Sequence, residues 1–234
     1  MEMLQNFVIF EGGDGSGTTT QLEFLRRRFA SGEGGENPAA FPVLFATAEP
    51  TAGPVGLLIR SALKGEIKLK GETLARLFAA DRGEHLYGPG GILERAGRGE
   101  LVVSDRYAPS SLVYQGLECG EELPHALNAP FPVPELILFF DLDPAIAAER
   151  IRNRPDRDIY EYLDFQIRVR ERYRALLPEF ARRGSRVETI DAAQSPGEVG
   201  RAIWGAILKM PILKMPVQKM PVLKMPATEG DLEA

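Results

Sequence analysis

The chain has 234 residues, is 44% hydrophobic and carries a net charge of -5 at neutral pH. This length suits one α/β domain around a single core, and the slight negative charge argues against broad electrostatic binding to nucleic acid. One cysteine and two histidines exclude an intrachain disulfide and a site with zinc-ligand spacing. The apolar run at residues 7–10 is too short for a signal or membrane segment, so we expect a cytoplasmic protein. Because of the net charge, we expect any anionic ligand to be small.

Short apolar runs alternate with longer helical patterns along the chain. The runs expected to form strands are residues 7–10, 43–45, 101–103, 136–140 and 187–190. Apolar residues recur at helical spacing in residues 22–29 and 74–78, and residues 168–177 are charged and favour a helix. This alternation predicts a parallel five-stranded sheet flanked by helices. The loops that follow its strands should meet at one edge, where such sheets bind ligands.

A glycine-rich loop follows the first predicted strand and leads directly into a predicted helix. The loop and helix start contain Gly12, Gly13, Asp14, Gly15, Ser16, Gly17, Thr18, Thr19 and Thr20. Glycines let consecutive backbone N–H groups curl around a phosphate, and the helix N-terminus adds donors and a positive partial charge. The spacing matches the phosphate-binding motif GxxxxGK[ST], with Thr19 at its magnesium-binding hydroxyl position. We therefore predict a nucleotide phosphate site; a glycine-rich turn without a ligand is the alternative.

The lysine position of this motif holds Thr18. An ammonium group there normally contacts the outer phosphates and neutralises charge as the terminal phosphoryl group moves. Losing a preorganised donor of this kind costs about 3 to 4 kcal/mol of transition-state stabilisation unless another cation replaces it. We expect the substitution to affect catalysis more than binding.

Two further stretches accompany the loop sequence FEGGDGSG of residues 10–17. They read LFAADRGEHL at residues 77–86 and DRYAPSSLVYQG at residues 105–116. In sequence, order and separation, the three stretches resemble the thymidylate kinase family of P-loop nucleoside monophosphate kinases, from about residue 6 to residue 208. The resemblance implies a P-loop NTPase fold that transfers the γ-phosphoryl group of ATP to dTMP with Mg²⁺, giving dTDP. It also implies a homodimer. From the net charge and the short apolar run at the N-terminus, we expect this cytoplasmic protein to bind neither nucleic acid nor a membrane.

The resemblance assigns the dTMP site to particular side chains. Phe78 would stack on the thymine ring; the alternative for Phe78 is a core position. Arg82 would donate to a base carbonyl; the alternative for Arg82 is a surface ion pair. Asp14 would contact the sugar 3'-hydroxyl, and Tyr160 would crowd the 2' position. Other residues expected to line the nucleotide are Arg106, Ser110, Ser111, Tyr114 and Gln115. Helix capping is the alternative for the two serines.

The resemblance also assigns the phosphate chemistry. Asp105 follows the third predicted strand, where a carboxylate can hold Mg²⁺ together with Thr19. Arg106 would bind the acceptor phosphate, and an arginine-rich lid at about residues 150–161 would cover the donor phosphates. The side chains expected to act in catalysis are Asp14, Asp105, Arg106, Arg152, Arg154 and Arg157. For the lid arginines, a solvated helix end is the alternative.

Two more positions where the family has arginine hold Ala48 and Ile159. Arg157 is the candidate to replace the arginine missing at Ile159, and Arg60 or a lid arginine is the candidate to replace another of the missing cations. The thinner set of phosphate-binding cations leaves two alternatives to dTMP kinase open. One is a catalytically weak nucleotide-binding homologue with a regulatory or interaction role, and the other is a kinase for a different deoxynucleotide.

The C-terminal segment repeats the triplet Lys-Met-Pro four times at five-residue spacing, beginning at Lys209. Proline at every fifth position excludes a continuous helix. We therefore divide the chain into a thymidylate kinase-like domain, residues 1–208, and an extended or disordered low-complexity tail, residues 209–234. The tail either has no catalytic role or docks on a partner through its apolar side chains.

Overall fold

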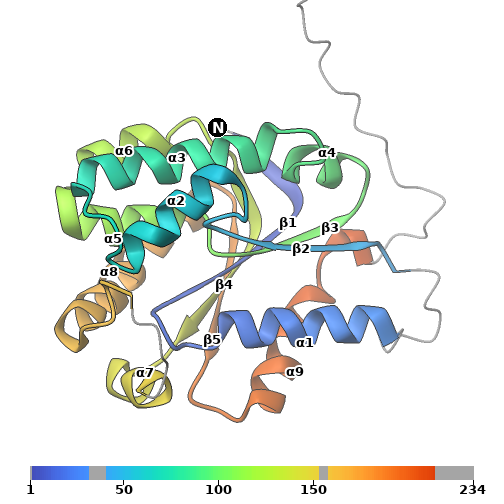
Figure 1. Cartoon of the computed structure of the whole chain (residues 1–234). Coiled ribbons are helices and arrows are strands. Elements are labelled where there is room, and N and C mark those ends of the chain that lie inside the picture. Colours follow the sequence, from blue (N-terminus) through green and yellow to red (C-terminus); the bar gives the residue numbers. More distant parts are fainter. Residues whose placement is uncertain (1, 32–40, 153–157, 214–234) are drawn as a thin grey trace, which may run out of the picture.

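The computed structural model describes residues 2–31, 41–152 and 158–213 (Figure 1). Its strands are β1 (Met3–Gly12), β2 (Leu44–Ala48), β3 (Leu101–Asp105), β4 (Val133–Asp141) and β5 (Arg186–Asp191). They form one sheet in the order β2-β3-β1-β4-β5, and every neighbouring pair is parallel. The predicted parallel five-stranded sheet is therefore confirmed, with each strand where an apolar run predicted it.

Helices cover both faces of this sheet (Figure 1). One face carries α1 (Thr18–Ser31) and α9 (Pro196–Ile207), which contribute Leu22, Leu25 and Ile203 to an apolar cluster. The helices that cover the other face include α2 (Pro54–Leu63), α3 (Gly71–Tyr87), α5 (Ala108–Cys119) and α8 (Leu163–Arg182). The shorter helices are α4 (Ile92–Gly97), α6 (Glu122–Asn128) and α7 (Pro144–Ile151).

Residues 7–10 of the central strand β1 are apolar because this part of the strand is buried on both faces. Alternate side chains point to opposite faces of a strand, so Phe7 and Ile9 belong to the cluster under α3 and α5. Val8 and Phe10 belong to the cluster under α1 and α9. This packing fixes the register of β1, and its carboxyl end delivers the glycine-rich loop to the edge of the sheet.

The first Lys-Met-Pro unit belongs to the folded domain. A short 3-10 helix, η2 (Pro211–Leu213), follows α9, and Met210 and Ile212 are 0% and 4% exposed in the cluster beneath that helix. Burial of apolar side chains outweighs the extended preference of the repeat here. The domain therefore extends at least to Leu213, past the predicted boundary at 208. Residues 214–234, with the other three repeats, lie outside the described residues.

Among the described helices, none combines the length and the apolar character needed to cross a membrane.

Candidate nucleotide-binding site

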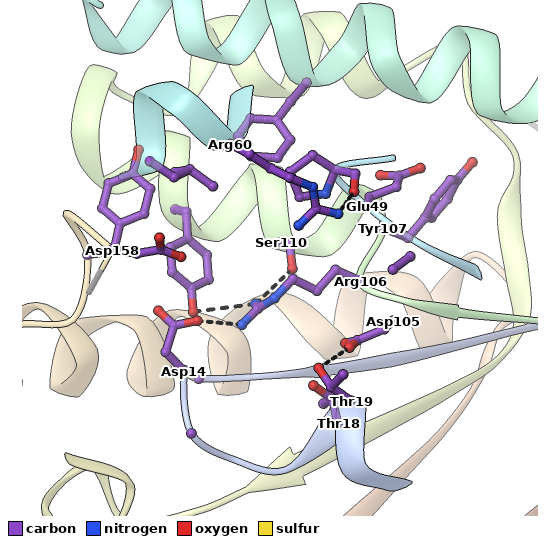
Figure 2. A pocket seen from close by; sticks show the side chains of 18 of the residues that line it. Asp14, Thr18, Thr19, Glu49, Arg60, Asp105, Arg106, Tyr107, Ser110 and Asp158 are labelled. Atoms are coloured by element: carbon purple, nitrogen blue, oxygen red, sulfur yellow. Dashed lines mark hydrogen bonds and ion pairs between the residues drawn. The ribbon is translucent and has the colours of Figure 1, made fainter. Parts of the chain in front are cut away.

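A cavity of about 450 Å³ opens at the carboxyl ends of β1, β2 and β3 (Figure 2). The predicted site residues that line it are Gly13, Asp14, Gly15, Gly17, Thr18, Thr19, Thr20, Phe78, Arg82, Asp105, Arg106, Ser110, Tyr114, Gln115 and Tyr160. Gly12, Ser16 and Ser111 are buried beneath this lining. Arg152 is exposed and pairs with Glu149 at 3.1 Å, away from the lining, and Arg154 and Arg157 lie outside the described residues.

The glycine-rich loop turns tightly between β1 and α1. Gly15 and Gly17 have φ angles of 82° and 96°, a left-handed conformation that glycine adopts without strain. A Cβ atom on Gly12 would lie 2.9 Å from the carbonyl oxygen of Phe140, so the start of the loop also requires a residue without a side chain. The loop leads directly into α1 at Thr18, so the free N–H groups of the first helical turn face the cavity.

Thr19 and Asp105 meet at the floor of the cavity (Figure 2). The Thr19 hydroxyl donates a hydrogen bond to Asp105 Oδ2 at 2.6 Å. Asp105 Oδ1 is buried and has no hydrogen-bond partner among the described residues. A carboxylate with an unused buried oxygen beside a threonine hydroxyl is a donor set that suits Mg²⁺, which prefers hard oxygen ligands.

Arg106 bridges the glycine-rich loop and α5 (Figure 2). Its Nη2 lies 2.6 Å from Asp14 Oδ1, and its Nη1 donates to the carbonyl oxygen of Gly12 at 3.0 Å. The guanidinium group also lies over the Tyr114 ring at 5.2 Å from its centroid. Arg106 therefore places a fixed positive charge directly over the phosphate loop.

Gln166, which the sequence analysis did not select, holds Asp14 from α8. Its Nε2 donates to Asp14 Oδ2 at 2.7 Å, and its Oε1 accepts from the Asp14 backbone N–H at 3.0 Å. The same Nε2 donates to the carbonyl oxygen of Tyr160 at 3.0 Å. One buried amide thus ties the phosphate loop to the end of the predicted lid.

The Arg82 guanidinium is 1% exposed and forms a buried ion pair. Its Nε and Nη2 donate to Glu49 Oε2 at 3.0 and 2.7 Å, and Nη2 also donates to Ser111 at 3.1 Å. Asn128 accepts from Nη1. Arg82 nevertheless lines the cavity, so it differs from the surface ion pair considered as its alternative.

Helix α3 also fixes the loop that follows β2. Asp81 accepts from the backbone N–H and the hydroxyl of Thr51 at 2.7 and 2.6 Å. His85 contacts Thr47 through Nε2 at 2.7 Å and Glu49 through Nδ1 at 3.1 Å. The FAADRGEH stretch of α3 therefore positions the cavity wall around Glu49, in addition to presenting Phe78 and Arg82.

Aromatic and amide side chains from α3, α5 and the predicted lid also line the cavity. Phe78 is half-buried, packs against the core and lines the cavity. It can therefore be a core residue and still contact a ligand, so the two alternatives for Phe78 do not exclude each other. Gln115 is 1% exposed, and its Oε1 is buried without a hydrogen-bond partner among the described residues. Tyr160 packs on Tyr114 at a ring-centroid distance of 5.4 Å, and its hydroxyl donates to Glu118.

Neither predicted serine caps α5. The N-cap residue of this helix is Tyr107, without a side-chain capping bond. Ser110 donates instead to Glu11 Oε2 at 2.7 Å and accepts from Arg106 Nη1 at 3.3 Å. With Ser111 bonded to Arg82, both serines face buried charged groups.

Asp158, another residue that the sequence analysis passed over, lies near Asp14 at the lid end (Figure 2). Burial raises the pKa of its carboxyl, and the negative charge of Asp14 raises that pKa further. Arg106, Arg60 and Lys64 act in the opposite direction. No local motif marks Asp158, because its importance arises only when the lid end folds back over the loop.

Two of the three positions at which the resemblance led us to expect a cation are open to the cavity; the third, Ile159, is not among its lining residues. Thr18 and Ala48 both line it, and the described cationic side chains that share the lining are Arg60, Lys64, Arg82 and Arg106. Arg60, from α2, donates to the carbonyl oxygen of Pro50 beside Ala48. The charge missing from the sequence motifs is therefore partly present in the same cavity, supplied from α2 and from the turn after β3.

The chain was compared with known proteins. A family model described as thymidylate kinase matches residues 10–203. A curated relative from Treponema pallidum is 42% identical over 177 residues, covering 75% of this chain and 81% of the relative. A relative from Pyrobaculum aerophilum is 40% identical over 195 residues, covering 82% of this chain and 91% of the relative. A third, from Methanococcus vannielii, is 34% identical over 171 residues, covering 73% and 77%. The names of all three assign them to thymidylate kinase.

The family match spans the phosphate loop, the α3 stretch and the DRY stretch, and thus the residues that surround the cavity. The resemblance inferred from the sequence is confirmed by this match and by relatives whose alignment with this chain covers most of their length. The chain belongs to the thymidylate kinase family.

Proposed function

We propose that this chain transfers the γ-phosphoryl group of ATP to dTMP, giving dTDP. The observation that carries the proposal is one cavity that joins a phosphate loop, a carboxylate–hydroxyl pair and an aromatic and amide wall. Membership of the thymidylate kinase family identifies the reaction. Because the acceptor phosphate is already an anion at neutral pH, the reaction needs positioning and charge neutralisation more than a strong base.

The donor phosphates would lie against the loop and the first turn of α1. Backbone N–H groups there supply donors that need no reorganisation during the reaction. Thr19 and Asp105 would hold Mg²⁺, and the unused Asp105 Oδ1 supports this assignment. When bound, the ion supplies charge neutralisation at the donor phosphates.

Arg106 would hold the acceptor phosphate. It reaches over the loop from the turn after β3, and its ion pair with Asp14 fixes the direction of the guanidinium group. Arginine is suited to this task because its planar donors match phosphate oxygens in pairs. Arg60 lines the same cavity beside Ala48 and would add charge where the family arginine is missing.

The base and sugar would lie between α3 and α5. Phe78 would stack on the pyrimidine, and the unpaired Gln115 amide oxygen would accept from a donor on the base edge. Arg82 keeps only part of its hydrogen-bonding capacity for a ligand, because Glu49, Ser111 and Asn128 already engage it. Tyr160 and Asp14 would bracket the sugar.

Charge relief at the transferred phosphoryl group would come from arginines outside the phosphate loop. Arg106 already contacts the loop at Gly12 and Asp14, and the lid arginines Arg152, Arg154 and Arg157 would join it on closure. Lid closure would also exclude water, which limits hydrolysis of ATP.

A homodimer and a cytoplasmic location are further parts of the proposal, implied by the family. Sedimentation of the purified protein would test the first: we expect a mass of two chains, and a single-chain mass at assay concentration would contradict it. Cell fractionation would test the second.

Steady-state kinetics with ATP, Mg²⁺ and a panel of nucleoside monophosphates tests the function itself. We expect the highest kcat/KM with dTMP, and activity that disappears when a chelator removes the metal. Preference for another acceptor, or nucleotide binding without turnover, would contradict the proposal.

A further inference from the structure

Glu11 is a buried carboxylate that the proposed mechanism does not use. It is the penultimate residue of β1, directly before the phosphate loop, and it is 0% exposed. Burying a carboxylate is costly unless donors surround it. Here Oε1 accepts from the Tyr107 backbone N–H at 2.9 Å, and Oε2 accepts from the hydroxyls of Ser110 and Tyr173 at 2.7 and 2.8 Å.

One of these donors, the Tyr107 N–H, belongs to the turn that carries Arg106, and another, Ser110, lies in the first turn of α5 directly after it. Arg106 has a φ of 73°, a left-handed conformation that is unfavourable for a residue with a side chain. Such a backbone persists only where its surroundings hold it. The Arg106 N–H donates to the carbonyl oxygen of Phe10 at 2.9 Å, and the next N–H, of Tyr107, donates to Glu11. The carboxylate thus closes the strained turn onto the end of β1.

The same carboxylate reaches the Arg106 side chain through Ser110. The Ser110 oxygen accepts from Arg106 Nη1 at 3.3 Å, and its proton is directed to Glu11. A neutral group at Glu11 would weaken the hydrogen bond that directs this hydroxyl, and a displaced group would remove it; either change alters what Ser110 offers to the guanidinium. Glu11 therefore influences both the backbone and the side chain of Arg106 without occupying the cavity lining.

We infer that Glu11 is a positioning residue for phosphoryl transfer, whose ionised carboxylate holds the turn at Arg106 and aims its guanidinium group at the phosphates. The inference rests on the proposed function and adds a residue to it. The ionised form suits the site because all three neighbours donate, whereas a protonated carboxyl must itself donate from one oxygen.

The charge state of Glu11 gives this role a measurable signature. Burial raises the pKa of its carboxyl to about 7, against the opposing effects of Ser110, Arg106, Tyr173 and the Tyr107 N–H. Among the described residues, the titratable groups that face it are Arg106 from the turn after β3 and Tyr173 from α8, whereas Tyr107 contributes its backbone N–H. The contribution of Glu11 should therefore be nearly complete at about pH 8, half lost at about pH 7 and nearly absent at about pH 6.

The test compares Glu11→Gln with the wild type across pH. An amide keeps the size of the carboxyl, but it carries no charge, and its NH2 end cannot accept from the Tyr107 N–H while its oxygen accepts from the two hydroxyls. Since hydrogen bonds to charged groups are the stronger ones, we expect kcat/KM for dTMP to fall about tenfold at pH 8. At pH 6 the wild type is itself protonated, so the ratio should shrink to about twofold. Titration of the substrate phosphate cancels in this ratio.

Glu135→Gln is the matched control. Glu135 accepts a hydrogen bond from the Asn6 N–H at 2.7 Å, at the opposite, amino end of the strands. The same chemical change there should leave the ratio of wild-type to variant kcat/KM at one at every pH. If wild type phosphorylates dTMP and the Glu11→Gln ratio does not vary with pH, the positioning role is wrong while the function stands. If wild type shows no turnover with any monophosphate, the function fails and the inference fails with it.

A second variant covers the case in which Glu11→Gln does not fold. Tyr173→Phe removes one donor to Glu11 but keeps its charge and its bond to Tyr107. Loss of that donor should raise the pKa of Glu11, so the pH at which kcat/KM reaches half its maximum should move upward. An unchanged midpoint would overturn the positioning role.

Discussion

The two ends of the cavity are built differently. At the base end, Arg82 is buried and bonded to Glu49, Ser111 and Asn128, so its position is set before any ligand arrives. At the phosphate end, Thr18 and Ala48 stand where the motifs have cations, and the charges come from Arg106 and Arg60 on other elements. On the proposed function, selectivity for the base would be preorganised in one buried network, whereas charge neutralisation would be distributed over several segments.

This difference has an energetic reason. A buried charge must be paired, so each residue of the Arg82 network depends on the others and single losses are costly. At the phosphate end, Arg106 is mostly buried and held by Asp14, but Arg60 is an exposed cation that remains hydrated, so its loss leaves no buried charge without a partner. We therefore expect substitutions at the base end to change stability and those at the phosphate end to change mainly kinetics.

The largest effect is expected for Arg82→Ala. It leaves the buried Glu49 without its arginine, although the contact with His85 remains, and this costs about 3 to 5 kcal/mol of unfolding free energy. Urea denaturation measures this loss. Arg27→Ala is the matched control, because it breaks an ion pair with Glu23 whose side chains are 72% and 50% exposed, and it should be neutral. Equal stability of the two variants would show that the base end is not a coupled network.

The second-largest effect is expected for Asp105→Asn, and it should appear in the reaction rate. Loss of the carboxylate charge beside Thr19 weakens the predicted Mg²⁺ site, and we expect about a 100-fold lower kcat/KM. Raising the Mg²⁺ concentration should restore part of the activity. A loss that is independent of Mg²⁺ would contradict the metal assignment at Asp105.

A smaller effect is expected for Arg60→Ala. Removing the cation beside Ala48 should raise the KM for dTMP about tenfold with little change in stability, since one hydrogen-bonded charge is lost. Arg76→Ala on α3 is the control, because Arg76 bonds the carbonyl oxygen of Glu72 outside the cavity. If both variants keep the wild-type KM, Arg60 does not compensate for Ala48.

The fold could be predicted from the sequence because buried parallel strands appear as continuous apolar runs. The phosphate loop could be located because its glycines and the strand before it are contiguous in the sequence. The partners of the site residues could not be predicted in this way. Gln166 reaches Asp14 across 152 positions and Tyr173 reaches Glu11 across 162, and only the completed fold brings them together.

The predicted end of the domain, residue 208, lies before the last buried residues. Met210 and Ile212 look like the start of a repetitive tail, yet the cluster beneath α9 buries them. A composition rule treats the four repeats alike, whereas the first one lies close enough to α9 to contact the core. Local composition cannot report this proximity, because it depends on where α9 ends.

The distribution of charge at the phosphate end is tested most directly by Thr18→Lys, measured as kcat with saturating ATP, Mg²⁺ and dTMP. Thr18 lines the cavity at the start of α1, so a lysine there would enter the phosphate site. If arginines from other segments already neutralise the transferred phosphoryl group, kcat should stay within about threefold of wild type, a difference below 1 kcal/mol in the barrier. A gain of about 100-fold or more would contradict this, because it would show that the wild-type loop lacks the charge that the reaction needs.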